Sequence, residues 1–217
     1  MIRNPVSRVK FLEENNELTQ LPSDDDVRNY FAVASQPLYD VASLILETGM
    51  RPEEVIHIRR DNVHLAENYY YNPHGKTKAA RRRIPLTANA AAVLKHRLET
   101  IPGPYIFPHE KDQNKPMLKV NHAHDGAVRR SRVRRFRLYD LRHLFATRLA
   151  QAGVDLVTLA ALLGHSKIQM VLRYAHPVDS HKVNAIRKLE DYTATRQIEE
   201  TTRQMDVFTV GNPDTLQ

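Results

Sequence analysis

Apolar residues recur at helical spacing in the first third of the chain. Their intervals of three and four residues predict a helix that ends near Gly49. The apolar face consists of Leu38, Val41, Ala42 and Ile45. Upstream, Ser23 and the three aspartates after it predict another helix start, with Ser23 as N-cap and Asp26 at the capping-box position. The aspartates complement the helix dipole, which explains them better than a metal site does.

From Asn62 the pattern changes to the alternation that is typical of strands. Val63 and Leu65 alternate with polar residues. Residues 69–71 and 83–86 are rich in side chains that favour strands. We therefore expect a small three-stranded antiparallel sheet whose last hairpin turns through residues 73–78.

Helices are expected to dominate the remainder of the chain. Thr87 is placed to cap an alanine-rich helix through Leu98, whereas the prolines of residues 102–119 indicate a loop. Residues 123–203 have a helical pattern. Breaks are expected at Gly153, Gly164 and Pro177. The expected fold class is α+β, a mainly α-helical domain with a small three-stranded antiparallel sheet.

Composition narrows the class of partner. The 217 residues carry 32 Lys and Arg against 25 Asp and Glu, and the net charge of +7 favours a polyanion, above all nucleic acid. The absence of cysteine excludes a disulfide scaffold and a Cys-based zinc site. No apolar run approaches the roughly 20 residues that cross a bilayer, so no membrane partner is expected.

Basic side chains cluster in residues 76–83 and 129–137. Each cluster alone could be a solvated charged face, but two in so basic a chain favour contacts with phosphates. The candidate DNA-binding residues are Lys78, Arg81, Arg82, Arg83, Arg129, Arg130, Arg132 and Arg134. His122 and His124 could bind a metal in principle. Because no convincing further ligands accompany them, they are interpreted as surface or DNA-facing histidines.

Three residues with complementary chemistry follow one another in the second half of the chain. Tyr174 could attack a phosphodiester, Arg142 could hold phosphate oxygens, and His165 could add a hydrogen bond or a proton. Such a set breaks the bond without a metal. Each residue also has an ordinary structural interpretation, as a core tyrosine, a surface arginine and a helix-capping histidine.

Five short motifs in order carry a resemblance to a known family. They are Thr48-Gly49-Met50-Arg51-Pro52-Glu53-Glu54, Gly75-Lys76-Thr77-Lys78, Asp140-Leu141-Arg142-His143 with Phe145-Ala146-Thr147, Leu163-Gly164-His165-Ser166, and Tyr174. With these motifs, the chain from about residue 4 to residue 184 resembles the catalytic domain of a tyrosine recombinase, the phage integrase family. The resemblance implies the tyrosine recombinase catalytic-domain fold.

The resemblance also implies a mechanism. Tyr174 would form a 3′-phosphotyrosyl bond with DNA and release a 5′-hydroxyl. Arg51 and Arg142 would grip the nonbridging oxygens, for which a planar and always charged guanidinium is suited. Lys76 would be the general acid for the leaving oxygen, and His165 would bond a nonbridging oxygen or share in proton transfer. The phosphotyrosine conserves the bond energy, so no cofactor, ATP or metal is implied.

The chain departs from the family pattern at Tyr139, where most members have histidine. Helical spacing still places Tyr139 on the same face as Arg142. A phenol can donate to a phosphate oxygen, but its pKa of about 10 makes it a poor base near neutrality. We expect a supporting role for Tyr139 in the catalytic set. Glu54 is expected to orient an active-site side chain.

The spacing of His165 and Tyr174 poses a geometric problem. An unbroken helix would separate the two residues by roughly 13 Å on opposite faces. Ser166 is placed to cap a new helix after a break at Gly164. The tyrosine segment must then bend inward or come from a neighbouring subunit, and cleavage in cis or in trans stays open.

The resemblance divides the chain into residues 1–181, the catalytic domain, and 182–217, a C-terminal helix with a mobile tail. The N-terminal core-binding domain of the family is expected to be absent. The partners implied are double-stranded DNA and further copies in a tetramer, in a nucleoid-associated protein of the cytoplasm. Apolar residues of the tail recur at helical spacing, and would pack on their own core or dock on a neighbouring protomer. They are Val183, Ile186, Leu189 and Tyr192.

Two other functions fit part of the pattern. Residues 146–163 mimic a helix-turn-helix, which would suit a DNA-binding protein without catalysis. A type IB topoisomerase or hairpin telomere resolvase would share the tyrosine chemistry.

Overall fold

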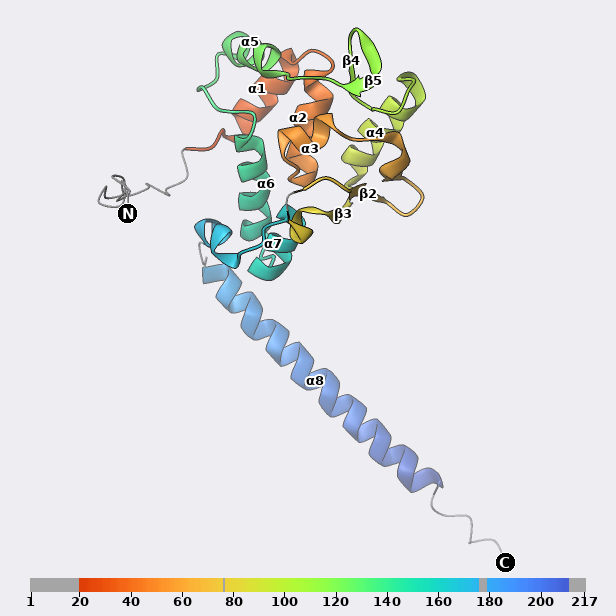
Figure 1. Ribbon diagram of the computed structural model, residues 1–217. Helices are drawn as coiled ribbons and strands as arrows, with labels where there is room; N and C mark the ends of the chain where they lie inside the picture. The colour runs from red at the N-terminus through yellow and green to blue at the C-terminus, as the bar shows by residue number, and fades with distance from the viewer. Residues whose placement is uncertain (1–19, 76, 176–178, 211–217) are drawn as a thin grey trace, which may run out of the picture. The chain divides into compact units, whose positions relative to one another are not determined.

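The computed structural model describes residues 20–75, 77–175 and 179–210. The chain divides into one compact unit up to Ala175 and a second from His176 onward. The helices of the first unit are α1 Asp24–Val33, α2 Leu38–Thr48, α3 Pro52–Ile56, α4 Ala88–Thr100, α5 Asn121–Ser131, α6 Asp140–Gln151 and α7 Leu156–Leu163 (Figure 1). The described residues of this unit also contain the 3₁₀ turns η2 Arg60–Asn62, η3 Lys78–Ala80, η4 Ile168–Met170 and η5 Leu172–Tyr174.

Two antiparallel sheets accompany the helices. The three-stranded sheet has the order β1-β2-β3, with β1 Val63–His64, β2 Tyr69–Asn72 and β3 Arg82–Pro85. It confirms the expected α+β class. A second sheet pairs β4 Pro108–His109 with β5 Asp112–Pro116, so the prediction of a loop over residues 102–119 was wrong there.

Helix ends follow the predicted local chemistry. The capping box is present, because the Ser23 side chain accepts from the Asp26 amide and the Asp26 carboxylate accepts from the Ser23 amide. Gly49 ends α2 with a φ of 65°, in the left-handed region that glycine tolerates. Thr87 caps α4 by accepting from the Ala90 amide.

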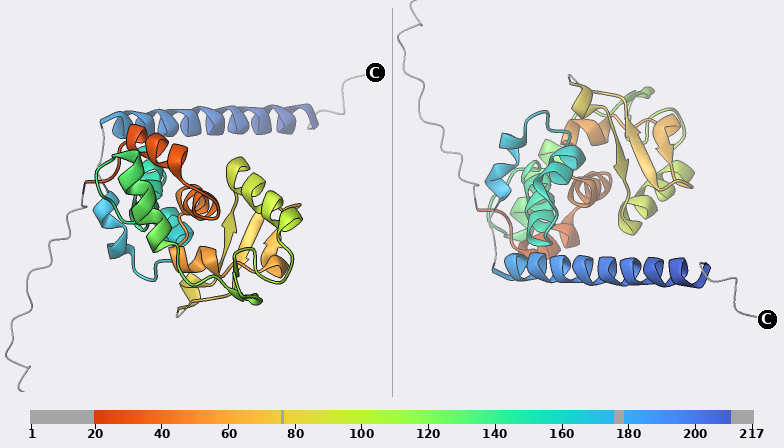
Figure 2. Two further views of the ribbon diagram at one scale, coloured as in Figure 1. Left: turned by 90° about the horizontal axis from the view of Figure 1, so that it is seen from above. Right: turned by 90° about the horizontal axis from the view of Figure 1, so that it is seen from below.

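Helix α2 forms the centre of the first unit. Its predicted apolar face is fully buried, and the helix packs against α3, α4 and α6. Figure 2 shows α1, α5, α6 and α7 on one side of α2, and the three-stranded sheet with α4 on the other. A second, smaller core joins α6, α7 and the 3₁₀ turns after them. Its buried members are Ala146, Leu159, Ala160, Leu163, Val171 and Tyr174. The tyrosine segment is thus packed against α6.

The structure corrects the interpretation of His124 as a surface or DNA-facing residue. His124 is 4% exposed, and its Nδ1 lies 2.9 Å from the hydroxyl of Tyr30. Its Nε2 lies 2.9 Å from the carbonyl oxygen of Phe136. Burial lowers the pKa of His124, so the ring stays neutral and joins α1 and α5 to the segment that leads into α6. His122 is exposed, as expected.

The predicted helical run from residue 123 is also interrupted before α6, where the sequence indicated no break. Helix α5 stops at Arg132, which has a φ of 56°. The following residues up to Tyr139 are irregular or turn-like, and Phe136 and Leu138 are buried in the main core. Arg129 and Arg130 therefore lie in the last turn of α5, and the other arginines of residues 129–137 follow the break, before α6 begins at Asp140.

The second unit consists of α8 Asp179–Val210 in its described part. The four apolar residues that the sequence placed on one face of this helix each have more than half of their surface exposed. The exposed fractions are 51% for Val183, 58% for Ile186, 59% for Leu189 and 57% for Tyr192. Pro177, predicted as a break, lies outside the described residues. None of the described helices is long and apolar enough to cross a membrane.

Candidate active site

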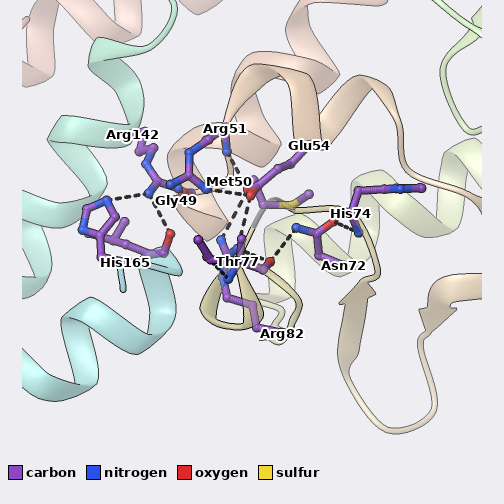
Figure 3. A network of polar contacts seen from close by, with 12 residues as sticks. Gly49, Met50, Arg51, Glu54, Asn72, His74, Thr77, Arg82, Arg142 and His165 are labelled. Carbon is purple, nitrogen blue, oxygen red and sulfur yellow. Dashed lines mark hydrogen bonds and ion pairs between the residues drawn. The ribbon is translucent and has the colours of Figure 1, made fainter. Parts of the chain in front are cut away.

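Arg142 lies in the first turn of α6 and is only 1% exposed. Its Nη1 donates to the carbonyl oxygen of Gly49 at 2.5 Å, and its Nη2 donates to that of Leu163 at 2.7 Å. Nη2 also lies 3.0 Å from Nε2 of His165 (Figure 3). Burial lowers the pKa of Arg142 to about 10, so the guanidinium remains charged at neutral pH. One charged group therefore holds together the ends of α2, α6 and α7.

Arg51 and Arg82 converge on the buried carboxylate of Glu54 (Figure 3). Glu54 accepts from the backbone amide and Nη1 of Arg51, both at 2.9 Å, and from Nη1 of Arg82 at 3.2 Å. Burial opposes the charge on Glu54, but Arg82 and then Arg51 outweigh it and hold its pKa below the usual range. Glu54 thus holds the side chain of Arg51, whose catalytic role stays a prediction.

The position of Arg82 differs from that of its arginine neighbours. Its side chain is 8% exposed, its Nε donates to the carbonyl oxygen of Leu162 at 2.8 Å, and its Nη1 donates to that of Ala80 at 3.1 Å. A Cβ on Gly164 would lie 2.6 Å from this Nη1, so only glycine allows the approach. These contacts occupy Arg82 within the fold, which does not favour the DNA contact expected for it.

His165 follows Gly164 at the end of α7. Because arginine has no acceptor, Nε2 of His165 must be the unprotonated nitrogen that accepts from Arg142. The proton is then on Nδ1, a buried atom without a hydrogen-bond partner in the described part of the chain. Burial, reinforced by Arg142 and then Arg51, lowers the pKa of His165 to about 4. The ring is therefore neutral at physiological pH.

A cavity of about 660 Å³ lies beside these groups. Arg51 and His165, which are far apart in the sequence, both line it, together with Gly75 and Thr77 of the β2–β3 connection. Lys76, the expected general acid, stands between these last two but lies outside the described residues. Arg51 brings a positive charge to this cavity, where it is paired with Glu54, and the cavity is large enough for a phosphodiester, whose oxygens the guanidinium and imidazole could contact.

Tyr174 belongs to η5 and is 4% exposed. Its hydroxyl lies 2.6 Å from Nδ1 of His143, the residue after Arg142. Burial raises the pKa of Tyr174 to about 12. Tyr139 packs edge-on against His143 at 5.1 Å between ring centroids, and the guanidinium carbon of Arg142 lies 5.9 Å from the Tyr139 ring. Tyr139 is thus near the expected site, and His143 is a contact that the sequence interpretation missed.

The segment between His165 and Tyr174 follows one of the two predicted alternatives, an inward bend after Gly164, but the predicted cap by Ser166 was wrong. Ser166 does not cap a helix, because η4 follows Lys167 without a side-chain cap. Instead, η4 and η5 are two short turns, and Val171 and Tyr174 are buried against α6 and α7. The tyrosine segment therefore bends back onto its own chain.

The other candidate DNA-binding residues are exposed. They are Lys78, Arg81, Arg83, Arg129, Arg130, Arg132 and Arg134. Arg83 lies over the ring of Tyr69 at 4.8 Å, and Arg130 donates to the carbonyl oxygen of Val33 at 3.0 Å. Arg134 hydrogen-bonds Gln20. These contacts leave the cationic groups accessible to an external phosphate.

Comparison with known proteins agrees with this geometry. The profile of the phage integrase family matches residues 13–181. The integrase of Salmonella phage P22 is 24% identical over 199 residues, which are 86% of this chain and 51% of that protein. A tyrosine recombinase of Pseudothermotoga lettingae is 29% identical over 197 residues, 87% of this chain and 64% of that protein. The chain belongs to the phage integrase family, and spans half to two thirds of the length of these curated relatives.

Solved structures share the fold. The Tn1549 transposon integrase in complex with a circular intermediate DNA has a TM-score of 0.68 at 18% identity, covering 82% of this chain and 68% of that chain. The crystal structure of XerA recombinase has a TM-score of 0.64 at 19% identity, covering 86% and 69%. The catalytic domain of bacteriophage HP1 integrase has a TM-score of 0.56 at 19% identity, covering 77% and 93%. The fold is that of tyrosine recombinase catalytic domains.

Proposed function

We propose that this protein is a site-specific tyrosine recombinase, which cleaves and rejoins double-stranded DNA through a 3′-phosphotyrosyl intermediate. The observation that carries the proposal is the meeting of Arg51, Arg142 and His165 from three distant segments, beside a cavity of about 660 Å³. Buried positive charge and fixed donors of this kind stabilise the charge that develops on a phosphate in the transition state.

Each residue has a role in this reaction. Tyr174 attacks the scissile phosphorus, and Arg51 and Arg142 stabilise the nonbridging oxygens. Lys76 protonates the leaving 5′-oxygen. His165 bonds a nonbridging oxygen. To donate from Nε2, which now accepts from Arg142, the ring must give up that contact and carry a proton on Nε2. Tyr139 supports the phosphate as a neutral hydrogen-bond donor.

Exposed arginines of the two basic clusters contact the DNA backbone in this proposal. Counter-ion release makes such binding salt-dependent. The apolar face of α8, formed by Val183, Ile186, Leu189 and Tyr192, docks on a neighbouring copy, because more than half of each side chain is exposed. Residues 182–217 thus serve assembly on DNA as a tetramer, and residues 1–181 carry the chemistry.

Covalent capture tests the chemistry. The protein is incubated with duplexes that contain a randomised central segment, and the products are separated under denaturing conditions. Peptide mass spectrometry then locates the attached nucleotide. We expect an adduct on Tyr174 that is lost in Tyr174→Phe and Arg142→Ala. An adduct on another tyrosine would contradict the assignment of the nucleophile.

The same variants separate the alternative functions. A DNA-binding protein without catalysis would bind equally well as Tyr174→Phe and form no adduct in the wild type. A topoisomerase would relax supercoiled plasmids without preference for a sequence, whereas a site-specific recombinase enriches a defined sequence among the captured duplexes.

A further inference from the structure

The cleavage step needs a group that accepts the proton of the attacking tyrosine. Burial raises the pKa of Tyr174 to about 12, so the phenol is neutral before attack and a weak nucleophile. Tyr139, the N-cap of α6, stands where most members of the family have histidine, and a phenol is a poorer proton acceptor than an imidazole. An imidazole close to the hydroxyl of Tyr174 would be better suited to this step.

Helix α6 brings one imidazole to the hydroxyl of the nucleophile. Nδ1 of His143 lies 2.6 Å from the Tyr174 oxygen, and the two rings are 5.9 Å apart at their centroids. His143 directly follows Arg142, so the same helical turn presents the phosphate-binding guanidinium and this imidazole in two directions. The Tyr139 ring packs edge-on against His143 and restricts its orientation.

We propose that His143 is a catalytic residue, the general base that takes the proton of Tyr174 during cleavage. The inference rests on the proposed function. In the forward step the phenolic proton passes to Nδ1 of His143 as the tyrosine oxygen bonds to phosphorus, and the bond from phosphorus to the 5′-oxygen breaks. The leaving oxygen takes a proton from the general acid and becomes a hydroxyl. In rejoining, protonated His143 returns its proton to the departing tyrosine oxygen.

The surroundings of His143 keep its ring neutral before substrate binds. Burial, followed by the charge of Arg173, lowers the pKa of His143 to about 4, and an unprotonated Nδ1 accepts the hydrogen bond of the Tyr174 hydroxyl. Arg137 and Arg142 act in the same direction, and Asp140 opposes them. A bound phosphate offsets the arginine charges and raises the basicity of His143 as the tyrosine attacks.

The proposal differs from a role in which His143 only holds the tyrosine in place. Asparagine separates the two, because its side-chain oxygen can lie near the position of Nδ1 and accept the same hydrogen bond but not the proton. A second distinction uses a scissile phosphate with a 5′-bridging sulfur. The thiolate leaves without a proton, so this substrate restores variants that lack the general acid and not those that lack the base.

The test measures single-turnover formation of the adduct on a duplex captured by the wild type, with the natural phosphate and with the bridging sulfur. Adduct formation by the wild type tests the proposed function separately from the variants. We expect His143→Asn to lose about 10²-fold or more in rate on both substrates, with unchanged DNA affinity and melting temperature. Added imidazole should restore part of the rate of His143→Ala. His96→Asn, an exposed histidine of α4, is the matched control with the wild-type rate.

Three results would overturn the proposal. The first is a wild-type rate in His143→Asn, which would assign His143 to holding the tyrosine. The second is recovery of His143→Asn by the bridging sulfur, which would assign it to the leaving group. The third is a slow His143→Ala that imidazole does not accelerate while its fold and DNA affinity are intact.

Discussion

Two parts of the candidate site are held in place by different means. They are the site cluster, formed by Arg51, Glu54, Arg82 and Arg142, and the tyrosine segment, residues 166–174. Arg142 and Arg82 are almost fully buried, and each donates to at least two backbone carbonyl oxygens. Among the described residues, the side chain of Tyr174 instead has one hydrogen bond, to His143, on a segment of two 3₁₀ turns. Donors fixed in advance need no reorganisation when charge develops on the phosphate. The fold therefore holds the site arginines with several hydrogen bonds each and gives the nucleophile few among the described residues.

Loss of Arg142 should have the largest effect on the cluster. In Arg142→Ala two buried carbonyl oxygens lose their donor at about 2 kcal/mol each, so we expect a loss of about 4 kcal/mol in the free energy of unfolding. Adduct formation should fall at least 10²-fold, by roughly the value of one transition-state donor. Urea denaturation and the capture assay measure the two effects.

Arg137→Ala is the matched control on the same helix end. Arg137 is 71% exposed and pairs with Asp140, so its loss should cost less than about 1 kcal/mol. Equal costs for Arg137→Ala and Arg142→Ala would contradict the view that burial of Arg142 organises the cluster.

Glu54→Gln tests the charge balance of the cluster at nearly constant shape. The amide cannot neutralise Arg51 and Arg82, and the side chain of Arg82 is 8% exposed. Removing one partner of a buried pair leaves an uncompensated charge, so we expect a loss of about 3 kcal/mol in the free energy of unfolding. A loss below about 1 kcal/mol would mean that the hydrogen-bond geometry, rather than the charge, holds the cluster.

Gly164→Ala tests the close contact between Arg82 and the backbone directly before His165. The φ of 67° and the approach of Arg82 Nη1 to 2.6 Å from a Cβ both oppose alanine, so we expect a loss of about 2 kcal/mol. Gly153→Ala controls for the backbone alone, because Gly153 has a φ of 84° and nothing within 4 Å of its Cβ. Its cost should be about 1 kcal/mol. Thermal denaturation compares the pair, and equal costs would show that Arg82 yields to the new methyl group.

The elements that the sequence predicted well are those with local causes. The capping box of α1, the glycine end of α2 and the cap of α4 depend on residues within one turn, so the pattern alone locates them. The hairpin of β4 and β5 escaped prediction because Asp112–Pro116 is polar and has no alternation. The break at Arg132 escaped because an arginine rarely adopts a positive φ.

The order of the motifs predicted which residues belong to the candidate site. It did not predict the burial and the contacts of each side chain. The burial of Arg82 did have a signal. Alternation along β3 places Arg82 on the same side as the apolar Ile84, two residues later, and Arg81 and Arg83 on the other. The contact of His143 with Tyr174 had none, because it depends on how two turns fold back onto α6.

Acid should weaken the contacts of both regions through their histidines. His143 and His165 have folded pKa values of about 4, below the ordinary 6.5. Between these values the unfolded chain binds more protons, so the free energy of unfolding should fall as pH drops from about 6.5 to about 4 and be flat above about 7. Urea midpoints at a series of pH values measure the slope. The double variant His143→Gln and His165→Gln should reduce it, and an unchanged slope would assign the effect to other groups such as His124.

Leu172→Ser should have the smallest effect of these variants, and it tests how firmly the tyrosine segment is held. Leu172 is 51% exposed although it lies between the buried Val171 and the half-buried Arg173, so its replacement should change the free energy of unfolding by less than about 0.5 kcal/mol. Val171→Ala, at a fully buried position of the same segment, should cost about 1–2 kcal/mol. Urea denaturation compares the two variants. A cost above 1 kcal/mol for Leu172→Ser would mean that the segment is held by more of its side chains than Val171 and Tyr174, and that the nucleophile is fixed as firmly as the arginines.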